Sequence, residues 1–124
     1  HPLEAARLLD STPAAVQVDR FFAVHQLAEQ FQCVVVLKGS GSLIAAPGEM
    51  TLVNPTGNAL LATAGTGDVL AGMLGALLAS GQTALQAARN AVFQHGKLAD
   101  DWALSHPGQV LTAGLLAQNH QSDL

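Results

Sequence analysis

Apolar and polar positions follow a helical period over the first 32 residues. Residues 3–9 carry apolar side chains at every third position, and Thr12-Pro13 is expected to end that helix. A second helix is predicted from Asp19 to about Gln32, because aspartate is a favourable N-cap and apolar residues recur there at helical spacing. The start of the chain is therefore predicted to be helical.

The pattern then changes to that of strands. Residues 33–37, Cys-Val-Val-Val-Leu, are continuously apolar and rich in β-branched side chains. Such a run indicates a strand buried on both faces, as in a parallel sheet covered by helices, and it predicts a buried Cys33. Residues 42–46 and 50–53 are expected to form a hairpin around a Pro47-Gly48 turn. A helix followed by a buried strand favours an α/β layer architecture.

A short apolar helix is predicted over residues 69–80, and Gly81 is placed to end it. Gly72, Gly75 and Ala79 are small residues within this helix. Because glycine costs about 1 kcal/mol relative to alanine in a helix, we expect these residues to serve the close approach of a neighbouring segment.

Two further helices are predicted towards the C-terminus. Thr83-Ala84-Leu85-Gln86 has the form of a capping box and begins a long helix that ends before Pro107. Residues 110–119 are expected to form the last helix, and the tail from His120 to Leu124 is expected to fray.

Two pairs of residues in the long helix call for interpretation. His95-Gly96 interrupts an otherwise strong helical pattern, so it either lets another segment approach or makes a harmless kink. Asp100 and Asp101 are adjacent, so on a helix they point about 100° apart and do not form a carboxylate pair. We interpret the two aspartates as part of a solvated face.

The composition indicates that part of the surface is covered. Of the 124 residues, 49% are hydrophobic and 11% are charged, against a usual charged share of about 25%. The cover is expected to be a partner subunit or a missing part of the same protein, and a homo-oligomer is favoured. Since the chain begins His-Pro-Leu-Glu without a methionine, we expect residues 1–124 to be the C-terminal part of something longer.

The charge distribution excludes some classes of partner. The net charge is −4 and the five Lys and Arg residues are scattered, which argues against nucleic acid binding. An anionic ligand would then be held by backbone N–H groups, a single lysine and a metal ion. The longest strongly apolar helix is too short to span a bilayer. The lone Cys33 allows no disulfide within the chain, which fits a cytoplasmic location, and the five histidines lack the spacing of a zinc site.

The stretch from Asn54 to Ser80 holds the strongest candidate for chemistry. Within it, Gly65-Thr66-Gly67-Asp68 is a glycine-rich turn that leads into a helix. Unpaired backbone N–H groups and the helix dipole favour an anion at such a turn, above all phosphate. A carboxylate beside a bound phosphate would be repelled, so Asp68 is either a general base for a substrate hydroxyl or only a stabiliser of the first helical turn.

A second candidate follows the predicted strand at residues 33–37. Lys38-Gly39-Ser40-Gly41 stands at the carboxyl end of that strand, where ligands gather in open α/β sheets. Lys38 either reaches a phosphate or nucleotide there, or merely ends the strand while the glycines make a hairpin turn.

Five pieces of the sequence together resemble a known family. In chain order they are His1-Pro2-x-Glu4, Val36-Leu37-Lys38-Gly39, Thr56-Gly57-Asn58, the run Ala-Thr-Ala-Gly-Thr-Gly-Asp-Val-Leu-Ala-Gly at residues 62–72, and His95-Gly96. They resemble the C-terminal half of the ADP/ATP-dependent NAD(P)H-hydrate dehydratases, over most of the chain. Related sugar and vitamin kinases usually carry Gly-Ala-Gly-Asp and lack the Thr-Gly-Asn piece.

The resemblance implies a fold, a reaction and partners. The fold would be α/β, the C-terminal half of a ribokinase-like three-layer α/β/α sandwich that binds nucleotide. The reaction would restore NADH or NADPH by dehydrating the S-epimer of their hydrates, coupled to cleavage of ADP or ATP in the presence of Mg²⁺. ADP is favoured over ATP, and a fused or separate NAD(P)H-hydrate epimerase domain is a further implied partner.

The resemblance also implies site residues. Asp68 would contact the hydrated nicotinamide ring and act as the base on its hydroxyl, and His1 would lie on the substrate side. The backbone of Gly65-Thr66-Gly67 would form the anion hole for the transferred phosphoryl group, whereas the ligands of Mg²⁺ are not placed. The residues implied to line the nucleotide are Lys38, Gly39, Ser40, Gly41, Ser42, Asn58, Ala59, Leu60, Leu61, Ala62, Thr63, Ala64, Gly65, Thr66 and Gly67.

The chain departs from the family pattern at one point, and two other functions stay open. Ala59-Leu60-Leu61 stands where many members have Pro-Gly-x after Thr-Gly-Asn. The first alternative is a ribokinase-like kinase of a hydroxymethylpyrimidine or a sugar, which would use the same anion hole and Asp68 but release a phosphorylated product. The second is a non-catalytic module that binds nucleotide or serves assembly.

Overall fold

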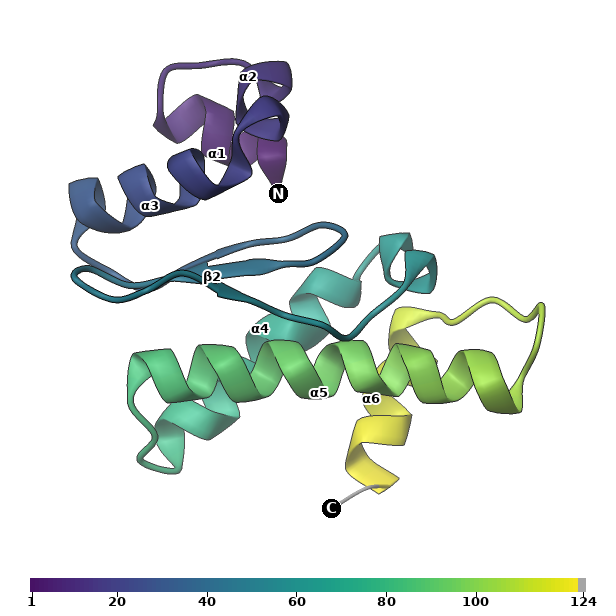
Figure 1. The fold of residues 1–124 in the computed structure, drawn as a ribbon. Helices are drawn as coiled ribbons and strands as arrows, with labels where there is room; N and C mark the ends of the chain where they lie inside the picture. Colours follow the sequence, from purple (N-terminus) through teal and green to yellow (C-terminus); the bar gives the residue numbers. More distant parts are fainter. Residues whose placement is uncertain (123–124) are drawn as a thin grey trace. The chain divides into compact units, whose positions relative to one another are not determined.

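The computed structural model describes residues 1–122, which divide into two compact units at the peptide between Asn54 and Pro55 (Figure 1). The elements in chain order are α1 (Pro2–Leu8), α2 (Pro13–Val18), α3 (Arg20–Phe31), β1 (Val35–Leu37), β2 (Leu43–Ala45), β3 (Leu52–Val53), the 3₁₀ turn η1 (Ala59–Ala62), α4 (Thr66–Ala79), α5 (Ala84–Ser105) and α6 (Ala113–Ser122). None of the helices within residues 1–122 combines the length and the apolar character needed to cross a membrane.

The first unit packs three helices beside a small sheet. Figure 1 shows α3 lying along the sheet with α1 and α2 beyond it. Its core joins side chains from all of these helices to the strands, namely Ala5, Ala6, Val16, Ala23, Val24, Leu27, Ala28, Leu37, Leu43 and Ala45. Burial of this apolar face, at about 25 cal/mol per Å², is what fixes the sheet against α3.

The sheet is an antiparallel meander in the order β1-β2-β3, so within residues 1–122 β1 makes no parallel pairing, and the hairpin alternative for residues 38–41 is the one observed. Val35 pairs with Ala45, and Leu43 pairs with Val53. The reason is that only residues 38–42 connect β1 to β2, which is a hairpin length, whereas parallel strands need a crossover of a dozen or more residues. The predicted second hairpin, from β2 to β3, is confirmed.

Cys33 is exposed, which corrects its predicted burial. Gln32 ends α3 in the left-handed conformation, with φ 50° and ψ 51°. The strand begins only at Val35, so the sulfhydryl lies in the turn between helix and strand. The continuous apolar run had suggested a strand two residues longer than the one observed.

Polar caps set the helix boundaries of this unit. The side chain of Asp19 accepts a hydrogen bond from the Phe22 N–H at 2.9 Å, which confirms the predicted start of α3. Thr12-Pro13 ends α1 as expected but also begins α2, a helix that the pattern did not predict. The Thr12 hydroxyl oxygen accepts from the Ala15 N–H at 3.1 Å, and a proline at the first helical position needs no N–H partner.

The second unit consists of α4, α5 and α6 with the turn η1. Figure 1 shows α4 beside the long helix α5, and α6 packs against both. The predicted capping box is present, because Thr83 and Gln86 exchange hydrogen bonds of 3.1 and 3.2 Å between side chain and backbone. The helix then continues through Gly96 without a break. Its buried face comprises Ala87, Ala88, Ala91, Val92, His95, Gly96, Leu98 and Ala99.

Three expectations for this unit are corrected. Helix α4 begins at Thr66, three positions before the predicted start. A Cβ built at Gly72 or Gly75 meets no atom within 4 Å in the part of the chain described, so the expected close approach does not occur there. Helix α6 runs through Ser122, so the predicted fraying is wrong for residues 120–122, and residues 123–124 lie outside the described residues.

Candidate functional site

The N-terminus of α4 presents backbone N–H groups, as the glycine-rich turn predicts. Gly65 caps the helix in the left-handed conformation, with φ 88° and ψ −9°, which glycine adopts without strain. Its carbonyl oxygen accepts from the N–H groups of Asp68 at 3.1 Å and Val69 at 3.3 Å. Within residues 1–122 the Gly67 N–H has no acceptor. The first turn of α4 therefore offers donors and a positive dipole end to an anion.

Asp68 is the third residue of α4 and its side chain is exposed. A carboxylate at this position can accept from the N–H of the capping residue, but this helix has no such side-chain cap bond. Asp68 lies in the first turn of α4, where the helix dipole favours a carboxylate, so the stabiliser and the general base both stay predictions. The carboxylate follows the Gly67 N–H, which has no acceptor within residues 1–122, whereas the Thr66 N–H donates to the Thr63 carbonyl oxygen at 3.4 Å. The Asp68 side chain is accessible to a ligand.

The residues before α4 form a compact segment that we call the Asn58 loop (residues 56–65). Ala59-Leu60-Leu61, where the chain departs from the family pattern, lies in the turn η1. The Asn58 side chain caps this turn by accepting from the Leu60 N–H at 2.9 Å. The Thr63 hydroxyl donates to the Leu60 carbonyl oxygen at 3.0 Å. The predicted nucleotide residues 58–67 are thus contiguous in structure as well as in sequence.

Thr66 joins the Asn58 loop to the helix. Its side chain is buried, with 5% of the residue exposed. The hydroxyl lies 2.6 Å from the Leu61 carbonyl oxygen and 3.0 Å from that of Thr63. The Thr66 carbonyl oxygen in turn accepts from Nε2 of His95, a buried residue of α5, at 2.9 Å. Because a carbonyl oxygen only accepts, His95 must carry its proton on Nε2 in this bond.

Helix α5 holds the start of the Asn58 loop through Asp100. One carboxylate oxygen accepts from the Gly57 N–H at 3.0 Å, and the other accepts from the Asn58 side-chain amide at 3.0 Å. This corrects the interpretation of Asp100 as a solvated residue, which holds only for the exposed Asp101. The spacing of Gly96 and Asp100, one helical turn apart, was the sequence signal that both face the same segment.

Gly96 lets the Asn58 loop lie directly against α5, which confirms the first of its two interpretations. A Cβ built there would overlap the Thr56 hydroxyl oxygen and would lie 2.6 Å from the Thr56 carbonyl carbon and 2.8 Å from the Gly57 nitrogen. The Thr56 hydroxyl donates to the Phe93 carbonyl oxygen at 2.8 Å. Any side chain at position 96 would therefore displace the backbone that leads into the predicted nucleotide residues.

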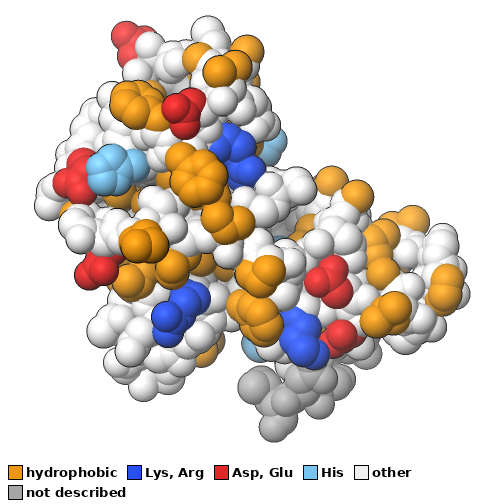
Figure 2. Space-filling view, in the orientation of Figure 1, with side chains coloured by type: hydrophobic (Ala, Val, Ile, Leu, Met, Phe, Trp, Pro, Cys, Tyr) orange, Lys and Arg blue, Asp and Glu red, His pale blue; other side chains and the backbone are white. Residues whose placement is uncertain are grey.

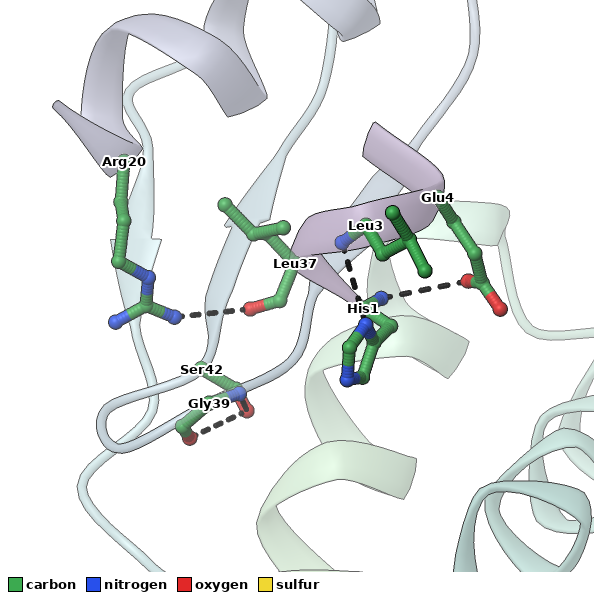
Figure 3. Close-up of polar contacts among 7 residues, drawn as sticks. All are labelled: His1, Leu3, Glu4, Arg20, Leu37, Gly39 and Ser42. Atoms are coloured by element: carbon green, nitrogen blue, oxygen red, sulfur yellow. Dashed lines mark hydrogen bonds and ion pairs between the residues drawn. The ribbon is translucent and has the colours of Figure 1, made fainter. Parts of the chain in front are cut away.

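In the first unit, the predicted nucleotide residues form the connection between β1 and β2, which we call the Lys38 loop (residues 38–42). The Ser42 hydroxyl lies 3.3 Å from the Gly39 nitrogen and 3.2 Å from the Gly39 oxygen (Figure 3). Lys38 is half-buried and makes no ion pair within the described chain. The hairpin interpretation of this segment is confirmed, and the loop keeps a cation and polar backbone groups at its surface.

Arg20, which the sequence pattern did not single out, holds the Lys38 loop. Its guanidinium donates to the Ser40 carbonyl oxygen at 2.8 Å. It also donates to the Leu37 carbonyl oxygen at 3.3 Å (Figure 3). A Cβ at Gly39 would lie 2.8 Å from a guanidinium nitrogen. Glycine is therefore needed at position 39 for Arg20 to reach these carbonyl groups.

His1, predicted on the substrate side, serves as the N-cap of α1. Its Nδ1 accepts from the Leu3 N–H at 3.2 Å, and the Glu4 carboxylate lies 3.4 Å from the His1 backbone nitrogen (Figure 3). The side chain is exposed. This contact fixes the ring at the start of α1 through one nitrogen, and the predicted substrate contact stays a prediction.

Charged groups are sparse around these loops. On the face drawn in Figure 2, cationic side chains lie singly or in small groups among apolar and uncharged surface. Among the described residues, no three His, Cys, Asp or Glu side chains gather closely enough to hold a metal ion. The structural donors at the candidate site are thus chiefly backbone N–H groups, as the sequence composition suggested.

The chain was compared with known protein families and structures. A family model described as NAD(P)H-hydrate dehydratase matches residues 1–121. The ADP-dependent (S)-NAD(P)H-hydrate dehydratase of Neisseria meningitidis is 48% identical over 94% of this chain and 38% of that protein. A bifunctional NAD(P)H-hydrate repair enzyme of Moorella thermoacetica is 40% identical over 92% of this chain and 22% of that protein.

The chain is also similar to solved structures of this family. The ADP/ATP-dependent NAD(P)H-hydrate dehydratase of Bacillus subtilis, co-crystallised with ATP/Mg²⁺, matches with a TM-score of 0.87 and 34% identity over 99% of this chain and 46% of that chain. A ribokinase-like superfamily protein of Enterococcus faecalis matches with a TM-score of 0.74 and 26% identity over 87% of this chain and 37% of that chain. The predicted ribokinase-like α/β fold class is confirmed, and the chain spans less than half the length of the proteins it matches.

Proposed function

Because the chain belongs to the NAD(P)H-hydrate dehydratase family, we propose that it is the C-terminal part of the nucleotide-binding domain of such an enzyme, a hydro-lyase. The substrate would be the S-epimer of hydrated NADH or NADPH, and dehydration would be coupled to cleavage of ADP or ATP. The name of a relative favours ADP, whereas the Bacillus subtilis protein was co-crystallised with ATP/Mg²⁺. We propose ADP as the physiological co-substrate.

The observation that carries this proposal is the exposed carboxylate of Asp68 beside the Gly67 N–H, which has no acceptor within residues 1–122, at the N-terminus of α4. Asp68 would accept the proton of the substrate hydroxyl, whose oxygen would then bond to the terminal phosphorus of the nucleotide as the shortened nucleotide leaves. The N–H groups of Gly65-Thr66-Gly67 would stabilise the charge on the transferred phosphoryl oxygens. Loss of the phosphate and of a neighbouring proton would restore the ring double bond.

The remaining predicted residues would bind and orient the two substrates. Lys38 would supply a mobile cation to the nucleotide phosphates, supported by backbone groups of residues 39–42, and residues 58–67 would line the nucleotide. Residues of this kind fit a phosphate, because glycine backbone admits close approach and N–H groups donate to phosphate oxygens. His1 would contact the hydrated nicotinamide nucleotide through its free ring edge.

Mg²⁺ would neutralise charge on the nucleotide phosphates and hold them in line for transfer. The described side chains supply no group of three carboxylate, imidazole or thiolate ligands, which fits an ion held mainly by phosphate oxygens and water. We further propose a cytoplasmic location, a homo-oligomer and a functional association with an NAD(P)H-hydrate epimerase domain, the last supported by the bifunctional relatives.

The test is a dehydration assay on the full-length protein. NADH hydrate, Mg²⁺ and either ADP or ATP are added, and the absorbance of NADH is followed. We expect a nucleotide-dependent rise, faster with ADP, and a loss of several orders of magnitude in kcat for Asp68→Asn with nucleotide binding largely retained. Asp101→Asn, which also removes one exposed carboxylate, is the matched control and should keep full activity.

Two other outcomes would refute the dehydratase. If a folded, nucleotide-binding protein gives no rise in NADH but phosphorylates an alcohol, it is a small-molecule kinase. If Asp68→Asn leaves both nucleotide affinity and every activity unchanged, the chain is a binding or assembly module. Release of free phosphate together with recovered NADH distinguishes the dehydratase from the kinase.

A further inference from the structure

Asp100 terminates a chain of three hydrogen bonds that runs into the turn η1. Its carboxylate accepts from the Gly57 N–H and from the Asn58 side-chain amide, both at 3.0 Å. The Asn58 side-chain oxygen, left free by this arrangement, accepts from the Leu60 N–H at 2.9 Å. Asp100 thus determines which way the Asn58 amide points, and thereby which of its ends caps η1.

This arrangement requires two acceptors at position 100. The Gly57 N–H and the Asn58 amide both donate, and only a carboxylate offers an acceptor to each. In Asp100→Asn one of these donors would face an NH₂ group. Reversing the Asn58 amide gives no relief, because its NH₂ group would then face the Leu60 N–H. Each choice leaves one donor of this partly buried cluster unpaired.

The turn η1 transmits this constraint to the candidate anion site. The turn η1, residues 59–62, is joined to Thr66 by a hydrogen bond. The buried Thr66 hydroxyl donates to the Leu61 carbonyl oxygen at 2.6 Å. Thr66 lies between Gly65 and Gly67, whose N–H groups are the proposed phosphate donors. A displaced η1 would therefore move the residue that positions these donors.

We propose that Asp100 is a positioning residue for the nucleotide site, which it orders by fixing the Asn58 amide and the turn η1. It acts through Asn58 and does not itself touch the nucleotide. The proposal rests on the proposed nucleotide-dependent function. It predicts that loss of the Asp100 acceptor pair lowers the fraction of molecules whose loop can bind nucleotide. The apparent Kd then rises in inverse proportion to that fraction.

The experiment compares Asp100→Asn with Asp101→Asn in the full-length protein. Both changes remove one negative charge from adjacent positions of α5, but the Asp101 carboxylate is exposed and pairs with Lys97 at 2.9 Å, away from the Asn58 loop. We measure amide hydrogen exchange over residues 55–62 without ligand, and the Kd for ADP by calorimetry. In Asp100→Asn we expect exchange at Gly57 and Leu60 to rise about tenfold, and ADP to bind about tenfold more weakly. Asp101→Asn should stay within twofold of the wild type in both.

Exchanging the acid and the amide between positions 58 and 100 should restore the hydrogen bonds that Asp100→Asn removes. Asn58→Asp alone places two carboxylates against each other and should increase exchange further. In the double variant Asp100→Asn, Asn58→Asp, the amide introduced at position 100 accepts from the Gly57 N–H and donates to the new carboxylate, which still accepts from Leu60. All three bonds are restored, so exchange should return to within twofold of the wild type.

The two readouts separate this inference from the proposed function. Unchanged exchange in Asp100→Asn, or no rescue in the double variant, would overturn the anchoring. Faster exchange with an unchanged Kd for ADP would show a merely structural bond and would also overturn the proposal. If the wild type binds no ADP, the proposed function fails and the nucleotide role of Asp100 fails with it, whereas the exchange data still decide the anchoring.

Discussion

The Lys38 loop and the Asn58 loop are each held by one charged side chain of a helix in the same unit, but the two charges are opposite. Arg20 of α3 donates to the carbonyl oxygens of Leu37 and Ser40. Asp100 of α5 accepts from the backbone of Gly57 and the side chain of Asn58. One anchor therefore occupies the acceptors of its loop, and the other occupies donors.

This difference indicates which groups each loop leaves for a ligand. Arg20 binds two carbonyl oxygens at the Lys38 loop and so reduces the negative potential there, while Lys38 stays available. Both effects favour an anion along the whole loop. In the Asn58 loop, the Gly57 N–H and the Asn58 amide already donate to the Asp100 carboxylate. Its remaining anion-binding groups are therefore concentrated at Gly65-Thr66-Gly67. An anion is thus expected to meet the second loop only at the helix N-terminus.

The loops also differ in how many contacts support them. The Asn58 loop has Asp100, the glycine contact at position 96 and the hydroxyls of Thr56, Thr63 and Thr66. The Lys38 loop has Arg20, the Ser42 hydroxyl and the Asn54 N–H, which donates to the Ser42 carbonyl oxygen at 2.8 Å. The Asn58 loop lies against helix backbone, whereas the Lys38 loop lies against a flexible side chain. We therefore expect single substitutions to affect the stability of the two loops to different extents.

Gly96→Ala should have the largest effect on the Asn58 loop. The new Cβ would meet the backbone of Thr56 and Gly57 at 2.6 and 2.8 Å, and overpacking of this kind costs typically about 3 kcal/mol at its upper end. Alanine returns about 1 kcal/mol through helix propensity. We predict a net loss of about 2 kcal/mol in the free energy of unfolding, measured by urea titration.

The matched control is Gly114→Ala in α6. There the nearest atom to the new Cβ is the Thr112 hydroxyl oxygen, 4.0 Å away, so the propensity gain should prevail and stability should rise by at most about 1 kcal/mol. If both variants are stabilised equally, the Asn58 loop does not lie against α5 as closely as the contacts at Gly96 require.

Arg20→Lys should have an intermediate effect, confined to the Lys38 loop. An ammonium group lacks the planar fork that reaches two carbonyl oxygens. Hydrogen bonds to charged groups contribute about 1.5–3 kcal/mol, and with partial exposure we predict a loss of about 1 kcal/mol in the free energy of unfolding. Arg7→Lys, on the exposed side of α1, should change stability by less than about 0.5 kcal/mol.

A double-mutant cycle with Gly39→Ala sharpens this prediction. Alone, the new Cβ should displace the guanidinium of Arg20 and cost about as much as Arg20→Lys. In an Arg20→Ala background the Cβ has no guanidinium to meet and only the strain at the Gly39 φ of 158° remains, so Gly39→Ala should cost less than it does with Arg20 present. Additive effects of the two changes would show that Arg20 and Gly39 are not coupled.

Local signals predicted much of the fold and the candidate site. The caps at Asp19 and Thr83, the hairpin after Pro47-Gly48 and the helix entry at Gly65 depend on a few neighbouring residues, so the sequence shows them directly. The antiparallel pairing of β1 was predicted only through the hairpin alternative for residues 38–41, because a continuous apolar run reports burial and not strand direction. The five-residue connection that follows was the signal that favoured this alternative.

The anchors were missed because their contacts are distant in sequence. Arg20 reaches residues 17 and 20 positions away, and Asp100 reaches residues 42 and 43 positions away. Periodicity shows which face of a helix carries a charge but not what lies opposite that face. Asp100 and Asp101 are adjacent, but only Asp100 lies one helical turn from Gly96, and only Asp100 meets the Asn58 loop.

The smallest expected effect concerns the hydroxyl of the Lys38 loop. Ser42→Ala removes two long contacts to Gly39, at 3.3 and 3.2 Å, in an exposed setting where water replaces them. We predict a loss below about 0.5 kcal/mol in the free energy of unfolding. Its counterpart Thr66→Val removes a buried hydroxyl that lies 2.6 Å from the Leu61 carbonyl oxygen, and an unpaired buried acceptor costs about 1–3 kcal/mol.

Thermal and urea unfolding of both variants, with the Kd for ADP, would measure this contrast. Ser42→Ala also releases the Gly39 N–H, which becomes available to a phosphate oxygen, so the Kd for ADP should change by less than about threefold. Thr66→Val should weaken ADP binding more, because it loosens the residue between the two proposed phosphate donors. If Ser42→Ala proves more damaging than Arg20→Lys, the Lys38 loop is held mainly by its serine, and the assignment of Arg20 as its anchor is wrong.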